Sequence, residues 1–328
     1  MTANQKVHQA GFTLVELLVS LVIVVILSSL TLSGLARLRS QAKVDKTTTT
    51  IRKLHEIVWP LVGGICTRRL EEPSGSSFFV APSGLTGKRL RAWQRRELIR
   101  RQQILEMPET WNEVADISGT NYLVPTLGVQ LTDATSSQNF TAPIKAYAAR
   151  KNAVNPSADY AAAECLFMIV AFSGDPDILE TFHSSEIGDK DGDGAPEFHD
   201  GWGKPILFMR WAPGITLPLP GITPGYSQIQ SSDPSMNPDF TDPMRLDTSE
   251  HGLIPLIWSA GPDDSLNDWN ASDPGYGFRA NNDGWLAAIM NAANGSPSVL
   301  YQLCTSTNGQ ALTPNAADNI TNHAIPLR

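Results

Sequence analysis

The chain has 328 residues, of which 41% are hydrophobic, enough to bury one large core or two modest ones, so disordered and collagen-like classes do not fit. Its formal net charge of -8 argues against a nucleic-acid binder, because such proteins present positive charge to phosphate. The three cysteines, Cys66, Cys165 and Cys304, form no CxxC pair, so neither a zinc ribbon nor a redox motif is present. In an oxidising compartment one disulfide could form, and the sequence does not indicate which two cysteines would pair.

The first long element is an apolar run near the N-terminus. Residues 17–36 carry no charge and are rich in Leu, Val and Ile. As a helix they would span roughly 30 Å, the hydrocarbon thickness of one bilayer. A buried core helix and a cleaved secretory signal are the alternatives, but a signal peptide has a shorter apolar stretch and rarely starts with an acid. The run therefore predicts one membrane crossing.

Glu16 lies at the start of this run, where a charge needs a reason. A carboxylate at the centre of a bilayer costs about 2.5–3.5 kcal/mol and normally marks function. A cut between Gly11 and Phe12 would create an α-amino group one helical turn before Glu16, on the same face. Cleavage at this bond would therefore supply Glu16 with a partner.

The sequence GFTLVE at residues 11–16, followed by an apolar stretch, resembles the class III signal of type IV pilins and type II secretion pseudopilins. The resemblance implies a leader at 1–11, removed after Gly11 by a prepilin peptidase, and N-methylation of Phe12. It implies that Glu16 pairs with the N-terminal amine of a neighbouring subunit in a filament. It also implies a single transmembrane helix at 12–36 in the inner (cytoplasmic) membrane, with the head in the periplasm or outside. The implied partners are other pilin or pseudopilin subunits, contacted through the N-terminal helix, and an inner-membrane assembly platform.

An amphipathic continuation of the helix is expected over 37–62. Apolar residues recur there at helical spacing, while Pro60 and two glycines that follow it favour an end. We expect one helix over 12–59 whose second half packs on a globular head, 63–328. The alternative is two helices broken in the threonine run 47–50, where helix propensity is low.

The head is expected to be α+β, with a small antiparallel sheet and long loops. Residues 71–87 read as loop, 88–107 as a basic helix, and 161–172 as a short core helix. The basic helix could contact anionic lipid or an acidic partner subunit, or be a solvated face. Strand-like composition at 205–211 and 253–260 predicts paired strands. The sequences GWGKPILF and PLIWSAGPDD in these stretches resemble, more weakly, head segments of major pseudopilins.

The most specific chemical motif is DKDGDGAPEFHD at 189–200. Acids at alternate positions with a glycine that permits a sharp turn can place several oxygens around a hard cation, and calcium prefers such loops. Resemblance to EF-hand-like loops would make the ligands Asp189, Asp191, Asp193, the carbonyl of Ala195, Glu197 and Asp200. An acidic surface turn without a cation is the alternative. A weaker resemblance to the calcium-binding head loop of major pseudopilins points to Asp263, Asp264 and Asp268.

Catalytic signatures are not evident. The sequence contains no HExxH zinc motif, no GxSxG nucleophile elbow and no phosphate-binding loop. We therefore expect a structural subunit of a type IV pilus or type II secretion filament rather than an enzyme, with no nucleic-acid partner. A surface binding or adhesive module on a pilin-type membrane anchor is the alternative, with a membrane-tethered enzyme third.

Overall fold

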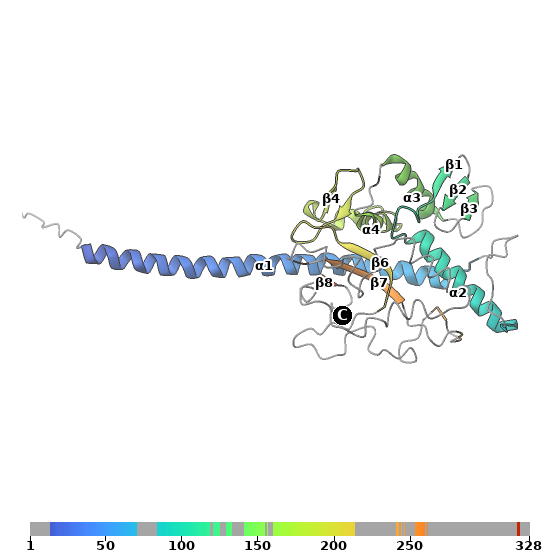
Figure 1. Ribbon diagram of the computed structural model, residues 1–328, viewed down its shortest axis with the longest axis horizontal. Helices are drawn as coiled ribbons and strands as arrows, with labels where there is room; N and C mark the ends of the chain where they lie inside the picture. The colour runs from blue at the N-terminus through green and yellow to red at the C-terminus, as the bar shows by residue number, and fades with distance from the viewer. Residues whose placement is uncertain are drawn as a thin grey trace, which may run out of the picture.

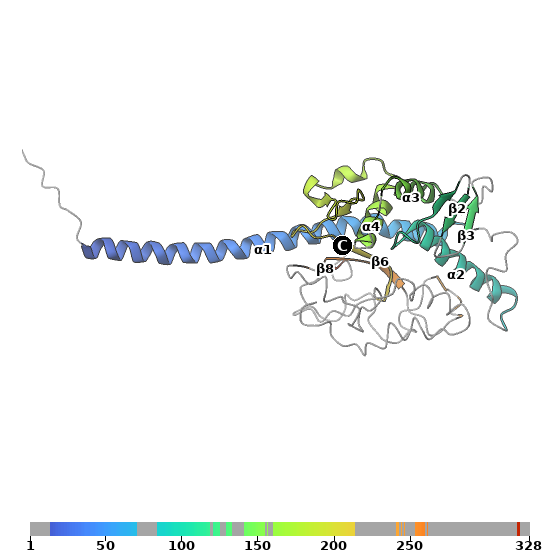
Figure 2. The same cartoon turned by 45° about the horizontal axis from the view of Figure 1, so that its top comes forward.

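The computed structural model describes the chain in several stretches and has an elongated shape: one long helix leads out of a mixed α+β head (Figures 1 and 2). The described residues are 14–70, 84–118, 121–124, 129–132, 141–154, 156, 160–213, 241–242, 244, 246, 253–259, 261 and 320–321. The expected α+β class is confirmed at this level.

Helix α1 (Leu14–Thr67) has two halves with opposite environments. The first projects beyond the head and leaves its apolar side chains exposed, for example Leu14 at 80% and Val24 at 60%. The second half buries a stripe at helical spacing in the main core: Ile51, Leu54, Val58, Val62 and Ile65. No helix in the described part of the chain has the length and apolarity that crossing a membrane requires.

The predicted C-terminal end of this helix at residue 59 is wrong, because α1 continues through Pro60 to Thr67. A proline inside a helix costs about 3 kcal/mol, mainly through a lost hydrogen bond and a steric clash. Pro60 lies on the exposed face, whereas Val62 and Ile65 beyond it are 3% and 1% exposed. Burial of an aliphatic side chain contributes about 1.5–3 kcal/mol, so packing of these two residues offsets the proline.

The alternative of two helices broken at the threonine run is also wrong, because α1 is continuous there. Thr47 and Thr50 are fully buried against the head. The Thr47 hydroxyl donates to the Lys43 carbonyl at 2.8 Å and accepts from the backbone N–H of Gly201 at 2.9 Å. The run therefore supplies polar contacts that attach the head to the helix.

The predicted basic helix is α2 (Gly87–Glu106), and its two ends differ. Lys88 and Arg89 near its start are exposed. Arg96 is 6% exposed and forms ion pairs with Glu97 at 3.2 Å and Asp242 at 3.7 Å. Part of the basic stretch therefore serves the interior of the head rather than a solvated face.

A small antiparallel sheet follows α2 in the chain, in the order β1 (Asp116–Ser118), β2 (Asn121–Val124), β3 (Val129–Thr132). Helices α3 (Ala142–Ala153) and α4 (Ala161–Ala171) come next. Nearly all of α4 is buried, as expected for a short apolar core helix. After two short 3-10 turns, η1 (Ile178–Thr181) and η2 (Ser184–Glu186), β4 (Ile187–Gly188) pairs with β5 (Glu197–Phe198).

The main sheet has the order β6 (Leu207–Pro213), β7 (Leu253–Ser259), β8 (Ile320–Thr321). Strands β6 and β7 are antiparallel, as predicted, with Leu207 opposite Trp258 and Phe208 opposite Ile257. Side chains alternate between the faces of a strand. Phe208 and Ile257 accordingly join the core around α1, whereas Leu207 and Trp258 belong to a second cluster that includes Ala163 of α4. Both faces of the sheet are thus covered.

Candidate functional site

The N-terminal signal lies at the outer end of α1. Gly11 and Phe12, the predicted cleavage and methylation residues, are outside the described residues. Glu16 is in the first turn of α1 and exposed, and its carbonyl accepts a hydrogen bond from the Ser20 hydroxyl at 2.7 Å. An acid in the first turn is favoured by the positive end of the helix dipole. The structure therefore places Glu16 in the exposed first turn of α1.

Besides the Thr47 contacts with Gly201, Glu186 of η2 also attaches the head to α1. Its carboxylate accepts hydrogen bonds from the Thr50 hydroxyl and from the backbone N–H of His183, and lies 3.3 Å from the Lys53 ammonium. Burial favours the neutral acid, but the hydrogen bonds of Thr50 and His183 and the charge of Lys53 outweigh it, so the pKa of Glu186 is lowered. The ionised form is thus the one that holds α1.

The acidic segment 189–200 contains the loop that connects β4 to β5, residues 189–196, and then β5 and two further residues. The first acid of the loop, Asp189, shapes it. The Asp189 carboxylate accepts the backbone N–H groups of Gly192 at 2.7 Å and Gly194 at 3.0 Å. Both glycines have positive φ, 79° and 92°, which glycine adopts without a Cβ penalty. The Asp193 carboxylate accepts the N–H of Ala195 at 2.7 Å. Asp189 therefore fixes the turn of the loop.

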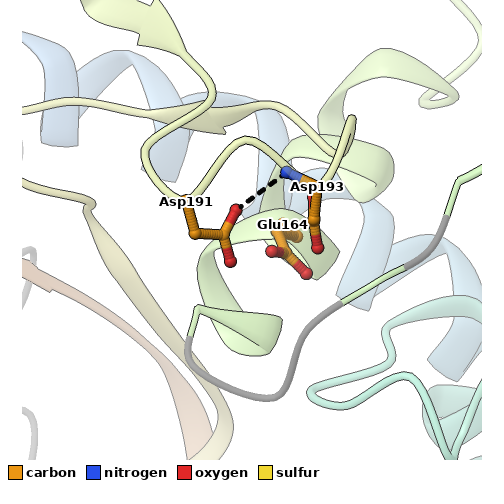
Figure 3. Close-up of side chains that lie close together, drawn as sticks. All are labelled: Glu164, Asp191 and Asp193. Atoms are coloured by element: carbon orange, nitrogen blue, oxygen red, sulfur yellow. Dashed lines mark hydrogen bonds between the residues drawn. The ribbon is translucent and has the colours of Figure 1, made fainter.

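Two of the predicted ligands meet a residue that the motif does not contain. Carboxylate oxygens of Asp191, Asp193 and Glu164 all lie within 4.8 Å of one another (Figure 3). Glu164 comes from the first turn of α4, and its side chain is 1% exposed. The sequence offered one signal for it, a single acid inside the apolar helix AAAECLFMIVA. Its pairing with a loop some distance along the chain is not visible from local spacing.

Glu164 is held in place by one oxygen only. Its Oε2 accepts a hydrogen bond from the Trp111 indole N–H, whereas its Oε1 is buried and has no hydrogen-bond partner among the described residues. Burial raises the pKa of Glu164 to about 8; the Trp111 hydrogen bond opposes this, and the nearby charges of Asp193 and Asp191 add to it. Such a carboxyl group binds either a proton or a cation more readily than it stays bare.

The remaining predicted ligands are engaged elsewhere or lie outside the described residues. Glu197 is fully buried and accepts the N–H of Lys190 at 2.6 Å. Asp200 accepts N–H groups of Trp202 and Lys204, and the Ser259 hydroxyl at 2.6 Å, so it braces the turn before β6. Ala195 is buried, and Asp263, Asp264 and Asp268 are not among the described residues.

Cysteine chemistry adds little to these sites. Cys165 on α4 is fully buried, and burial raises the pKa of its thiol. Cys165 and Cys66 are not joined by a disulfide, and Cys304 lies outside the described residues. A buried thiol with a raised pKa is a poor nucleophile.

Comparison with known proteins bears on the N-terminus. Residues 6–32 match a family model described as the prokaryotic N-terminal methylation motif. No curated protein and no solved structure matches the chain. The resemblance of the head to major pseudopilins therefore stays a prediction. The chain carries the N-terminal methylation motif, the signal of type IV pilins and pseudopilins.

Proposed function

We propose that this protein is a pilin-like structural subunit of a type IV pilus or a type II secretion filament. A prepilin peptidase cuts after Gly11, Phe12 is methylated, and the exposed half of α1 lies in the inner membrane before it packs with other subunits. The head, in the periplasm or outside, has a structural rather than an enzymatic role. The methylation motif at residues 6–32 supports a type IV pilin-like precursor.

The observation that carries the proposal is the apolar surface of the first half of α1. Side chains from Leu14 to Leu27 are exposed on all sides of the helix, with Val15 at 69% and Leu21 at 66%. Each such side chain gains about 1.5–3 kcal/mol when it is fully removed from water. A surface of this kind is characteristic of an element that is covered by lipid or by copies of itself.

Glu16 would select the register of the assembled helices. An unpaired carboxylate among packed apolar helices is costly, and pairing with an amine reduces that cost. After cleavage, every subunit carries both a free amine at Phe12 and a carboxylate at Glu16. Apolar packing then supplies the attraction between helices, and the charge pair fixes their axial offset.

The attachment of the head to α1 makes the chain suitable for such a lattice. The Thr47 and Thr50 contacts lie in the middle of α1, well beyond the exposed apolar half. If the helices bundle through their first halves, the second half of each α1 would therefore hold its head outside the bundle. A filament with heads on its surface follows from this arrangement.

Incorporation of variants into filaments tests the proposal. Glu16→Gln keeps the size of the side chain and removes its charge, so we expect it to reach the membrane and fail to enter sheared filaments. Glu56→Gln is the matched control, because Glu56 is an exposed acid on the same helix, within its head-bound half. Equal incorporation of Glu16→Gln and wild type would contradict the proposed charge pairing.

A further inference from the structure

The loop between β4 and β5 and helix α4 together form a cluster of three carboxylates. Asp191 and Asp193 come from the loop and Glu164 from α4, and one oxygen of each lies within 4.8 Å of the others. Figure 3 shows the three side chains converging on the space between the loop and the helix. Three carboxylates this close repel one another unless a positive charge lies between them.

The buried acid is the second and independent observation. Glu164 is 1% exposed, and its Oε1 has no hydrogen-bond partner in the part of the chain that the structure describes. A buried carboxylate oxygen without a partner costs free energy, so native structures usually satisfy it with a donor, a water molecule or an ion. Trp111 donates to the other oxygen, Oε2, so Oε1 is the oxygen that a bound ion could satisfy.

Hydrogen bonds from residues outside the cluster also hold the backbone of the loop in shape. Asp189 accepts two backbone N–H groups of the loop, and Arg150 of α3 donates to the Gly194 carbonyl at 2.6 Å. These bonds fix the backbone on either side of Asp191 and Asp193. The ligand oxygens are therefore presented by a preformed turn, which reduces the ordering cost of binding.

We propose that Glu164, Asp191 and Asp193 bind one divalent cation, calcium, which ties the β4–β5 loop to α4. All three ligands are oxygens, which hard cations prefer, and calcium accepts six to eight of them at about 2.3–2.6 Å. Oxygens on opposite sides of a calcium ion lie about 5 Å apart, so atoms within 4.8 Å of one another match its sphere. Asp189, Glu197 and Asp200 shape the surrounding backbone.

This site is separate from the filament proposal, since its residues are in the head and none belongs to α1. Loss of calcium binding would leave the N-terminal signal and Glu16 as they are. Conversely, a chain that failed to enter filaments through Glu16 would still bind calcium. The two proposals can therefore fail independently.

Calcium titration of the full chain, purified in detergent and freed of metal with a chelator, tests the site. We expect isothermal titration calorimetry to give one ion per chain for wild type and an affinity lower by about tenfold or more for Asp191→Asn. Asp191 is exposed, so this variant should keep the wild-type circular dichroism spectrum. Terbium bound beside Trp111 should show luminescence sensitised by the indole, and calcium should displace it.

Asp177→Asn is the matched control, because Asp177 is an exposed acid at the start of η1, outside the cluster. It should bind calcium as wild type does. Glu164→Gln keeps an acceptor for Trp111 and should also weaken binding. Wild type without saturable binding would overturn the site, and so would wild-type affinity in Asp191→Asn. Wild-type affinity in Glu164→Gln alone would overturn the role of Glu164.

Discussion

Replacing Gly201 with alanine should weaken the contact between the head and α1 and so destabilise the protein. Gly201 begins the turn that leads into β6, and its backbone lies directly against α1. A Cβ atom at this position would lie 2.8 Å from the Lys43 Cα and would overlap the Lys43 carbonyl oxygen. Both atoms belong to the backbone of the long helix, so a side-chain rotation cannot relieve the clash.

The expected loss combines two effects. Overpacking against a rigid neighbour costs about 1–3 kcal/mol. The hydrogen bond from the Gly201 N–H to the Thr47 hydroxyl, 2.9 Å long, would be lost or stretched, at about 1 kcal/mol. The free energy of unfolding should therefore fall by about 2–4 kcal/mol, which lowers the Tm by roughly 4–16 °C for domains of 150–250 residues.

Thermal unfolding of the full chain in detergent, followed by tryptophan fluorescence, measures this loss. Gly64→Ala is the matched control, since Gly64 is an exposed residue within α1 and a Cβ there would meet nothing within 4 Å. Alanine inside a helix should add about 0.5–1 kcal/mol, so the two identical substitutions should shift the Tm in opposite directions. A Gly201→Ala protein as stable as wild type would refute the close packing of Gly201 against the backbone of α1.

Two further predictions concern buried charges. Because the pKa of Glu186 is lowered, its contribution to the free energy of unfolding is fully present above the ordinary carboxyl pKa of 4.5 and is lost as pH falls through its native pKa. Chemical unfolding across the acid range should therefore show a smaller loss of stability for Glu186→Gln than for wild type. A wild-type pH profile in that variant would contradict the argument. Arg210, 1% exposed, pairs with Glu113 at 2.9 Å, so Arg210→Met should cost about 3–5 kcal/mol because it leaves the buried Glu113 carboxylate without its opposite charge. The double variant with Glu113→Gln should recover part of this loss in the same unfolding assay, and no recovery would count against the pair.

The elements that could be predicted from the sequence are those with strong local patterns. The continuous helix, the α4 core helix and the β6–β7 pair follow from apolar periodicity and composition. The predicted end of α1 was wrong because Pro60 lies on an exposed face of the helix, while residues beyond it continue to pack in the core. The short strands β1 to β3 depend on pairing between neighbours rather than on a distinctive local pattern.

The acidic segment 189–200 likewise shows that local sequence patterns predict only part of a site. Local spacing indicated which acids could share an ion, but two of them, Asp189 and Asp200, serve as hydrogen-bond acceptors for backbone turns. Glu164 joins the cluster only through tertiary packing of α4 on the loop. A lone acid in an apolar helix was the available hint, and its partner could be found only from the fold.

The measurement that tests the central claim most directly is mass spectrometry of the N-terminus of the protein extracted from membranes. The account predicts a chain that begins at Phe12 and carries one added methyl group on its amine. A chain that still begins at Met1, or that is cut beyond the apolar residues 17–36, would contradict it. In the first case Glu16 would lack the amine on which the proposed assembly depends, and in the second case the chain would have lost Glu16 itself.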